Sequence, residues 1–242
     1  MNLFNCNKKD GCLKMKFYII NGSNRKKSNT YKLLKKSLDG IKDQVNKELP
    51  GENVNLNFIN LYNLNFTGCK SCFACKRLKN PKKYGTCPIK DDLKPILEDM
   101  RDCDGVILGS PIYLVSVSGE MRSFYERFIF PSFRYSKNGD SIAPKKMPIA
   151  VIYNMNVDED FALMNYQFIF DNFESFIELV YTKPYSLKVY NTYQFKDYSQ
   201  YYMEMFDEVE KAKYRDEHFP VDLENAYDLG VKVASDAIKK FK

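Results

Sequence analysis

A single histidine, His218, occurs in the 242 residues of this sequence, and that scarcity excludes much of the usual hydrolytic chemistry. A Ser-His-Asp or Cys-His catalytic site needs an imidazole as its base, and His218 is expected at the surface. The adjacent acids Asp91 and Asp92 are interpreted as residues of a helix start, where negative charge is favourable. No set of acid and base residues stands out, which favours an enzyme whose chemistry is done by a bound cofactor.

Long apolar segments are also missing. The longest uncharged, mostly apolar run is Gly105 to Ser118, well short of the ~20 residues that a membrane-spanning helix needs. The N-terminal stretch MNLFNCNKKDGCLK lacks the apolar centre of a signal peptide. We therefore expect no membrane partner and a cytoplasmic location, where thiols stay reduced and clustered cysteines indicate metal or redox chemistry.

The apolar residues that are present make up 44% of the chain, enough for a substantial core. Strand-like and helix-like segments alternate, and this order predicts a parallel sheet covered by helices on both faces. Residues 1–14 are predicted to be a flexible extension that precedes one domain over 15–242. Predicted strands are 16–21, 53–61, 105–111, 147–154 and 185–191; predicted helices start at Ser28 or Asn29, at 91, at 118, at 160 and at Pro220.

A polar loop, GSNRKKSNT over residues 22–30, lies between the first predicted strand and the helix that follows it. It offers hydroxyl groups, three basic side chains and the free amides of a helix N-terminus, which suit a phosphate group. It matches neither GxxxxGK[ST] nor GxGxxG. An ordinary capped turn is the alternative interpretation.

A second loop, SPIYLVSVSGEM over residues 110–121, follows the third predicted strand. Its aromatic residue and backbone are suited to line a flat, partly apolar ligand, although Tyr113 in the core is the simpler alternative. Both loops follow the carboxyl ends of strands, which is where ligands bind in open parallel sheets.

Four cysteines fall within CKSCFACKRLKNPKKYGTC, in a predicted cysteine-rich loop over 66–90. Cys69, Cys72 and Cys75 have the spacing CxxCxxC, and eleven residues separate Cys75 from Cys87. The pattern leaves open an iron–sulfur cluster, a zinc site, a redox dithiol or no metal role.

The same loop is strongly basic, with seven lysine and arginine residues and no acidic residue between Cys69 and Lys90. This excess predicts attraction for an anionic partner, and a merely solvated loop is the alternative. A metal-structured module that binds nucleic acid is a more remote alternative.

Together, these motifs resemble the flavodoxin-like NAD(P)H-dependent FMN reductases and, more closely, the iron–sulfur flavoproteins. The resemblance rests on IINGSNRKKSNT, on CKSCFACKRLKNPKKYGTCPIKDDL, on GVILGSPIYLVSVSGEMRSFYERF and on FPVDLENAYDLGVKVA, and covers roughly residues 15–190 and 219–241. It implies a flavodoxin-like, doubly wound α/β fold with a five-stranded parallel sheet of order 2-1-3-4-5. Residues 193–218 are then expected to be an insertion.

The resemblance also assigns site residues. It places the FMN phosphate at Ser23, Arg25, Ser28, Asn29 and Thr30, and the isoalloxazine ring at Pro111, Ile112, Tyr113, Leu114, Ser118 and Gly119. The third flavin loop corresponds to residues 154–158, which lack the expected glycines. Ligands of a [4Fe-4S] cluster would be Cys69, Cys72, Cys75 and Cys87.

The function implied is that of an FMN-dependent oxidoreductase. Electrons would pass from NAD(P)H, or from a reduced carrier, to a quinone, a nitroaromatic, a flavin or a redox protein, with a cluster as a relay if one is bound. A flavin electron carrier without turnover of its own is the alternative. An acidic redox protein such as ferredoxin is expected at the basic loop, and the resemblance suggests a homo-oligomer.

Overall fold

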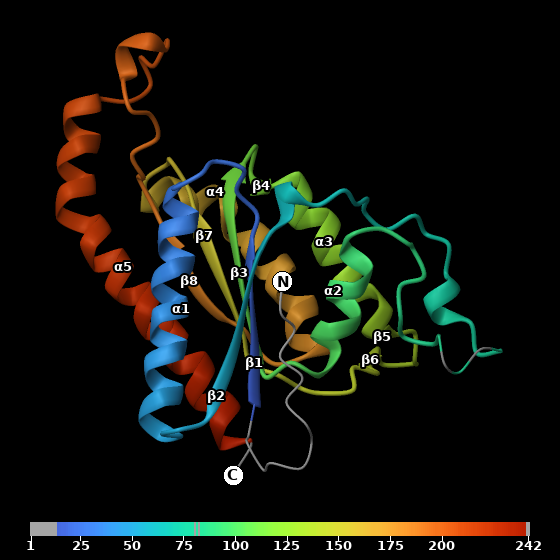
Figure 1. Ribbon diagram of the computed structural model, residues 1–242. Coiled ribbons are helices and arrows are strands. Elements are labelled where there is room, and N and C mark those ends of the chain that lie inside the picture. Colours follow the sequence, from blue (N-terminus) through green and yellow to red (C-terminus); the bar gives the residue numbers. More distant parts are fainter. Residues whose placement is uncertain (1–13, 80, 82, 241–242) are drawn as a thin grey trace.

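A parallel sheet lies at the centre of the computed structural model, which describes residues 14–79, 81 and 83–240 (Figure 1). Its strands run in the order β2-β1-β3-β7-β8, which confirms the predicted topology. A short strand, β4 (Ser116–Val117), pairs antiparallel with the end of β3. The parallel strands are β1 (Lys14–Asn21), β2 (Asn53–Asn60), β3 (Gly105–Tyr113), β7 (Ile149–Asn154) and β8 (Tyr185–Val189).

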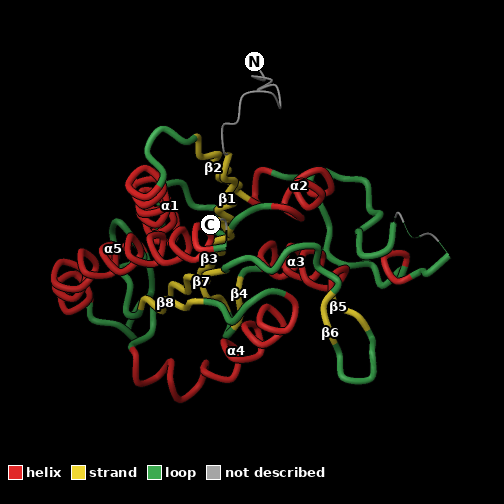
Figure 2. Tube along the Cα trace, turned by 90° about the horizontal axis from the view of Figure 1, so that it is seen from below, coloured by secondary structure: helices red, strands yellow, loops and turns green. Residues whose placement is uncertain are grey.

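Helices cover both faces of this sheet, so that two apolar cores form (Figures 1 and 2). On one face lie α1 (Asn29–Glu48) and α5 (Glu208–Lys239). The other face is covered by α2 (Leu93–Asp99), α3 (Gly119–Ile129) and α4 (Glu159–Val180). A separate hairpin joins β5 (Phe133–Arg134) to β6 (Asp140–Ser141) beyond the end of α3.

The central strands are apolar on both sides because both sides are buried. In β1, Phe17 and Ile19 belong to the core under α1 and α5, whereas Tyr18 and Ile20 belong to the opposite core. This alternation follows from the two-residue period of a strand. No helix among the described residues is long and apolar enough to cross a membrane.

The first strand begins earlier than predicted, at Lys14 rather than Lys16. Lys14 pairs with Asn53 and Met15 with Val54, so the ladder to β2 holds both residues in the sheet. The predicted extension over 1–14 is therefore wrong at its last residue, and residues 1–13 lie outside the part that the structure describes.

The last helix also begins earlier than predicted. Its first residue is Glu208 rather than Pro220, and the Asp207 carboxylate caps it by accepting a hydrogen bond from the Glu210 N–H at 3.0 Å. Pro220 lies inside the helix, although a proline there removes one hydrogen bond and usually ends the helical run. The predicted insertion over 193–218 is thus part loop and part helix.

The predicted helix over 160–180 is confirmed, but the four aromatic and methionine residues that indicated it lie on its exposed side. Met164 and Phe168 are 85% and 73% exposed, and Phe161 and Phe176 are also exposed. The buried side is formed by another apolar set, Ala162, Phe170, Phe173, Ile177 and Val180. Because α4 is apolar nearly all round, its period could not indicate which side faces the sheet.

The two helices on one face, α1 and α5, touch through their backbones. A Cβ atom added to Gly40 would overlap the carbonyl group of Tyr227, and one added to Gly230 would overlap that of Ser37. Glycine at both positions therefore allows an approach that any side chain would prevent. The Gln44 Nε2 donates to Ser235 Oγ at 2.9 Å beside this contact.

We expect Gly230→Ala to lower the free energy of unfolding by roughly 2 kcal/mol or more, measured by denaturant titration. The overlap with the Ser37 carbonyl must force the helices apart, and overpacking of this kind costs about 1–3 kcal/mol. Gly119→Ala is the matched control, since a Cβ at that helix start meets no atom within 4 Å. Equal stability of Gly230→Ala and the parent protein would contradict the contact.

Candidate functional site

The loop between β1 and α1 has the features of an anion site. Ser28 caps α1, as predicted, because its Oγ accepts a hydrogen bond from the Tyr31 N–H at 3.1 Å. The first turn of α1 carries no acidic residue, so the partial positive charge of the helix N-terminus is not offset there. Ser23 is buried at the start of the loop, and the Gly22 N–H donates to Gly109 O at 2.8 Å.

A cleft of about 850 Å³ opens beside this loop, at the carboxyl ends of β1, β3 and β7. Its lining brings the two predicted loops together with the residues that follow β7, including Asn154, Met155 and Asn156. Eight of the eleven residues predicted to bind the cofactor line it: Ser23, Arg25, Ser28, Asn29, Thr30, Pro111, Ile112 and Tyr113.

The other three predicted residues lie outside the lining. Leu114 is fully exposed at the tip of the β3–β4 hairpin, where Leu114 and Val115 both have positive φ, 47° and 64°. Ser118 is buried and caps α3, with its Oγ accepting from the Met121 N–H at 3.3 Å. Gly119 is the first residue of α3 and is exposed. A positive φ is strained for a β-branched residue such as Val115, and such strain clusters at functional sites.

Three oxygen atoms in the cleft residues are buried without a hydrogen-bond partner among the described residues. They are Thr30 Oγ1, Asn154 Oδ1 and Asn156 Oδ1. An unpartnered buried polar atom costs about 1–3 kcal/mol, so the cleft suits a ligand that donates hydrogen bonds to the asparagine oxygens and pairs with the threonine hydroxyl. Residues 154–158 thus contribute two asparagines to the cleft in place of the expected glycines.

A segment between β8 and α5, residues 192–206, forms part of the cleft and is called the arm here. Figure 1 shows it beyond the carboxyl edge of the sheet, next to the start of α1. The Asn29 Nδ2 donates to Tyr193 O at 3.0 Å, and the Arg25 Nη1 donates to Gln194 O at 2.9 Å. Two side chains predicted to bind phosphate therefore bind carbonyl groups of the arm, a long-range contact that the local motif did not indicate.

Aromatic rings hold the arm together. Phe195 and Tyr201 stack with centroids 4.0 Å apart, and Tyr193 lies 4.8 Å from Tyr198. The buried Tyr198 hydroxyl accepts a hydrogen bond from the Gln194 N–H at 2.9 Å. Six consecutive arm residues, 192–197, line the cleft together with Gln200, Tyr201 and Arg215. No motif in the sequence indicated these residues.

A buried lysine joins the arm side of α5 to the loop after β7. Lys211 is only 3% exposed, and its Nζ donates to Asn156 O at 2.8 Å and to Asn191 Oδ1 at 2.7 Å. Burial lowers the pKa of Lys211 to about 8, and the nearby Asp158 carboxylate opposes that shift only in part. Lys211 thus fixes the backbone of a cleft residue.

The four clustered cysteines line one small depression against the last turn of α3. Cys75 is buried, and this burial raises the pKa of its thiol, which Lys76 opposes. The Cys69 N–H donates to Glu126 Oε2 at 3.1 Å. Within the described residues, however, no three His, Cys, Asp or Glu side chains are grouped closely enough to hold a metal ion.

One buried cation, Arg127, and one partly buried cation, Lys76, anchor this cysteine loop. The fully buried Arg127 forms an ion pair with both carboxylate oxygens of Asp91 and donates to Thr67 O at 3.0 Å. Burial alone would raise the pKa of Asp91, but the hydrogen-bonded Arg127 guanidinium holds it below its usual range. The Lys76 ammonium donates to the carbonyl groups of Phe130, Pro131 and Phe133. Asp91 therefore pairs with a buried arginine rather than serving only the start of α2.

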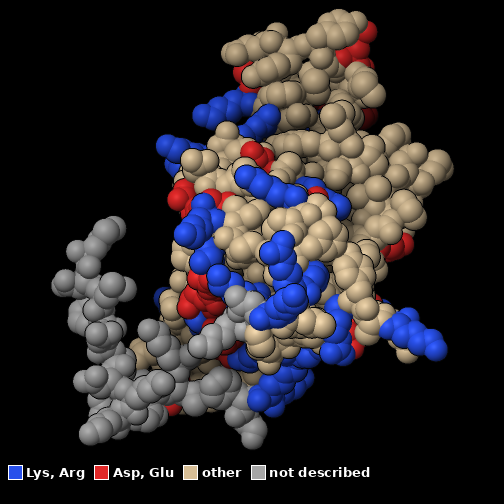
Figure 3. Space-filling model, turned by 90° about the vertical axis from the view of Figure 1, so that its right-hand side faces the viewer, with Lys and Arg blue, Asp and Glu red and all other residues tan. Residues whose placement is uncertain are grey.

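The cysteine depression and the cleft lie at opposite ends of α3. Its 11 residues span about 16 Å at a rise of 1.5 Å per residue. Figure 1 shows the cysteine loop on the side of the molecule away from the arm. Lysine and arginine side chains gather on that side (Figure 3), and the exposed ones from the cysteine loop are Lys70, Arg77, Lys79, Lys83 and Lys90.

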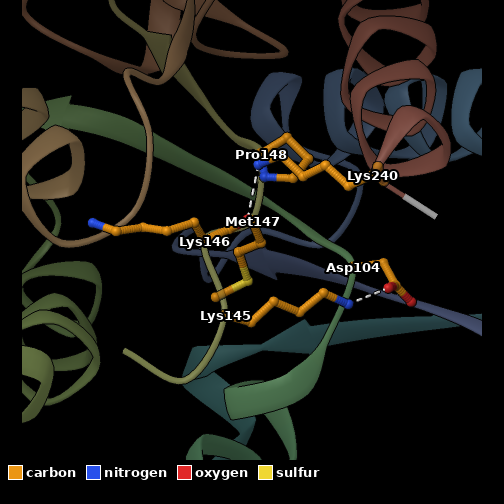
Figure 4. Close-up of a pocket in the computed structure, with 7 residues that line it drawn as sticks. Asp104, Lys145, Lys146, Met147, Pro148 and Lys240 are labelled. Carbon is orange, nitrogen blue, oxygen red and sulfur yellow. Dashed lines mark hydrogen bonds and ion pairs between the residues drawn. The ribbon is translucent and has the colours of Figure 1, made fainter. Parts of the chain in front are cut away.

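A further pocket of about 280 Å³ lies at the amino ends of β3 and β7 (Figure 4). Its cations are engaged with the protein itself, since Lys145 pairs with Asp104 and the Lys240 Nζ donates to Lys146 O at 2.8 Å. The Lys146 Nζ turns away to Val180 O at 2.8 Å. These contacts stabilise the sheet at the amino ends of its strands. They leave few free lysine N–H groups for an anionic ligand.

Comparison with known proteins identifies the family. The sequence profile of the NADPH-dependent FMN reductases matches residues 15–153, more than half of the chain. The chain belongs to the NADPH-dependent FMN reductase family. The resemblance and the flavodoxin-like fold inferred from the sequence are thereby confirmed.

The relatives found by sequence similarity carry the name iron–sulfur flavoprotein. One from Methanocaldococcus jannaschii is 34% identical over 113 residues, covering 47% of this chain and 51% of the relative. One from Archaeoglobus fulgidus is 31% identical over 113 residues, covering 47% and 48%. The chain thus spans about half the length of the relatives it matches.

Solved structures of this reductase fold match most of the chain. The azoreductase AzrA has a TM-score of 0.62 at 13% identity and covers 90% of this chain and 99% of its own. An NAD(P)H:quinone oxidoreductase from Methanothermobacter marburgensis has a TM-score of 0.63 at 12% identity, covering 90% and 98%. At such identities the likeness shows the fold alone. The arm lies beyond residue 153, outside the family profile.

We expect the free energy of unfolding to rise between pH 8 and 10 by on the order of 2 kcal/mol through Lys211 alone. Its pKa is lowered to about 8 in the folded protein but is about 10.4 when unfolded. The unfolded state therefore binds more protons in this window, and stability increases with pH.

The measurement compares denaturant unfolding of the parent protein and Lys211→Met at pH 7, 8, 9 and 10. The parent is expected to gain this increment in stability and Lys211→Met is expected to lack it. Lys213→Met, at a well-exposed neighbouring lysine, should keep the parental pH dependence. If the free energy of unfolding changes with pH equally in Lys211→Met and in the parent, the lowered pKa of the buried Lys211 is contradicted.

Proposed function

We propose that this protein is an FMN-dependent oxidoreductase that passes electrons from NAD(P)H, or from a reduced carrier, to a small acceptor or a redox protein. The observation that carries the proposal is the cleft at the carboxyl edge of the sheet. There, a helix N-terminus without acidic residues meets three buried oxygens that have no partner among the described residues. Membership of the FMN reductase family supports the choice of cofactor.

The residues present fit that cofactor. The α1 amides, with Ser23 and Ser28, would hold a phosphate group, since helix N-termini bind anions. Asn154 and Asn156 would accept hydrogen bonds from the cofactor, the Thr30 hydroxyl would donate to its phosphate group, and Tyr113 would flank its ring. FMN, when bound, supplies the hydride and single-electron chemistry. The chain's own residues bind and orient it, and no side chain is assigned as an acid or base.

Thr30→Val should weaken FMN binding about tenfold, because a hydrogen bond worth about 1–1.5 kcal/mol is lost. Affinity is measured by quenching of flavin fluorescence during reconstitution. Thr67→Val, which alters an exposed hydroxyl outside the cleft, should bind FMN like the parent. A parent protein that stays colourless after reconstitution would contradict the proposed function.

Anaerobic addition of NADH or NADPH to the FMN-loaded protein distinguishes the enzyme from a flavin electron carrier. Rapid bleaching of the flavin absorbance by either nucleotide is expected. A flavin that only a chemical or protein reductant bleaches would favour the carrier. The acceptor is then found by oxidising the reduced protein with quinones, nitroaromatics and free flavin.

We also propose that Cys69, Cys72, Cys75 and Cys87 hold a [4Fe-4S] cluster. The four thiols line one depression between apolar side chains, and thiolates are the usual ligands of such clusters. Relatives that carry the name iron–sulfur flavoprotein support this choice. In the described residues, the cysteine side chains lie farther apart than a metal site requires. The proposal therefore includes a movement of the four thiols toward the iron when the cluster binds.

Protein purified without oxygen should therefore contain iron and acid-labile sulfide, and Cys87→Ser should lose most of both. Cys103→Ala is the control, since Cys103 is buried elsewhere, against Met147. Zinc in place of iron, or no metal in the parent protein, would contradict the cluster. Neither result would alter the FMN content expected from the cleft.

An acidic redox protein such as ferredoxin is proposed as a partner at the exposed lysines of the cysteine loop (Figure 3). Charge steering of this kind weakens with salt, so a salt-independent rate of reduction would contradict it. Of the predicted basic residues, Lys76 is engaged with backbone carbonyls, and Lys82 lies outside the described residues.

The exposed apolar side of α4 supports a homo-oligomer. Sedimentation velocity measures this oligomeric state.

A further inference from the structure

The cleft is large, and it is more basic than one phosphate group requires. Its volume of about 850 Å³ is near the upper end of the ~300–1,000 Å³ typical of small-molecule sites. Six basic residues and one acidic residue line it, and a single phosphate group carries at most about two negative charges. The basic residues are Arg25, Lys26, Lys27, Lys32, Lys196 and Arg215, and the acidic residue is Asp197.

The one acidic side chain does not cancel this excess. The Asp197 carboxylate accepts hydrogen bonds from the Ser199 N–H and hydroxyl at 3.0 and 2.6 Å and from Gln200 Nε2 at 2.9 Å, all within the arm. Four of the basic residues belong to the phosphate loop and α1, where the cofactor phosphate is proposed to bind. Lys196 of the arm and Arg215 of α5 form a second group of cations.

This second group lies among aromatic rings. The Arg215 guanidinium is 4.5 Å from the centroid of the Tyr193 ring. Among the described residues, only its Nε has a partner, the Asp216 carboxylate at 2.7 Å. The stacked rings of Phe195 and Tyr201 line the same cleft, and Tyr201 is 52% exposed. Flat rings beside a guanidinium with unused donors suit a ligand that is itself flat and negatively charged.

The geometry points to a second ligand subsite on the arm, formed by Phe195, Tyr201, Lys196 and Arg215. We propose that it takes a planar aromatic molecule bearing a phosphate or carboxylate group, beside the subsite for the cofactor. The inference rests on the proposed function in one respect, namely that FMN occupies the phosphate-loop side. Two sources share this chemistry: a pyridine nucleotide electron donor and a carboxylated aromatic acceptor.

The Arg25 and Asn29 contacts give this subsite a fixed position. Arg25 lies 5.9 Å from the centroid of Phe195 while it donates to Gln194 O. Together with Asn29 it ties the arm to the phosphate loop, so that the two subsites share one cleft. A ligand on the arm would therefore lie next to the cofactor rather than at a remote surface.

Isothermal titration calorimetry of the FMN-loaded protein tests the subsite with three probes: 4-nitrobenzoate, its uncharged counterpart 4-nitrobenzamide, and NADP⁺. Arg215→Gln should weaken binding of the anionic probe or probes about tenfold, the effect of losing a charge-assisted hydrogen bond. It should leave 4-nitrobenzamide unchanged. Phe195→Leu should weaken every probe that binds, because it removes a stacking surface.

Lys213→Gln is the matched control, since it removes a well-exposed cation of α5 that does not line the cleft. Tight binding of 4-nitrobenzoate indicates an acceptor site, and tight binding of NADP⁺ indicates a donor site. The subsite is overturned if neither anion binds the parent protein, or if Arg215→Gln binds both as the parent does.

Failure of the proposed function would be seen separately, as absence of bound flavin after reconstitution. In that case, the same titrations on the flavin-free protein still test the arm, because none of the substituted residues belongs to the phosphate loop. FMN affinity of Arg215→Gln and Phe195→Leu should equal that of the parent protein. A joint loss of FMN and probe binding would instead assign these residues to the cofactor and contradict a second subsite.

Discussion

The backbone contact between α1 and α5 is the constraint on which the functional end of the molecule depends. Gly40 and Gly230 let the two helices run in direct contact along one face of the sheet. Because α1 starts at the phosphate loop, the arm that precedes α5 arrives beside that loop (Figure 1). Hydrogen bonds from Arg25 and Asn29 to arm carbonyls complete the link. The arm and the C-terminal helix thus help to shape a cleft whose other lining residues all lie within the first 156.

Positive charge serves two purposes in this protein. Arg127 and Lys211 are buried and Lys76 is partly buried, and all three donate hydrogen bonds to carbonyl or carboxylate oxygens, so they fix loops. Burying a charge is costly unless such partners surround it. The exposed lysines of the cysteine loop remain available to ligands, as do the cations of the cleft other than Arg25, which donates to Gln194 O. The two available groups lie at opposite ends of α3, which separates the proposed electron-relay site from the proposed flavin site.

The sheet order and the phosphate loop could be predicted because their signals are local. An apolar strand, a polar loop and the Ser28 cap follow one another within a few residues, and alternating elements fix a doubly wound sheet. The arm could not be predicted in this way, because the contacts from Arg25 to Gln194 and from Lys211 to Asn156 join distant segments. The start of α5 was predicted at Pro220 instead of Glu208, because a proline usually marks a helix end and not its interior. In α4, apolar residues occur on every side, so the sequence could not indicate which of them pack against the sheet. Met164, for example, is exposed to solvent.

Hydrogen–deuterium exchange of the backbone amides, with and without FMN, tests the central claim that the cofactor binds in the carboxyl-edge cleft. Binding should slow exchange in residues 23–30, 112–113 and 154–156, which come from three segments that meet only in the folded protein. The amides of the cysteine loop at the far end of α3 should keep their rates. Slowed exchange confined to the cysteine loop, or unchanged exchange throughout the cleft at saturating FMN, would contradict the account.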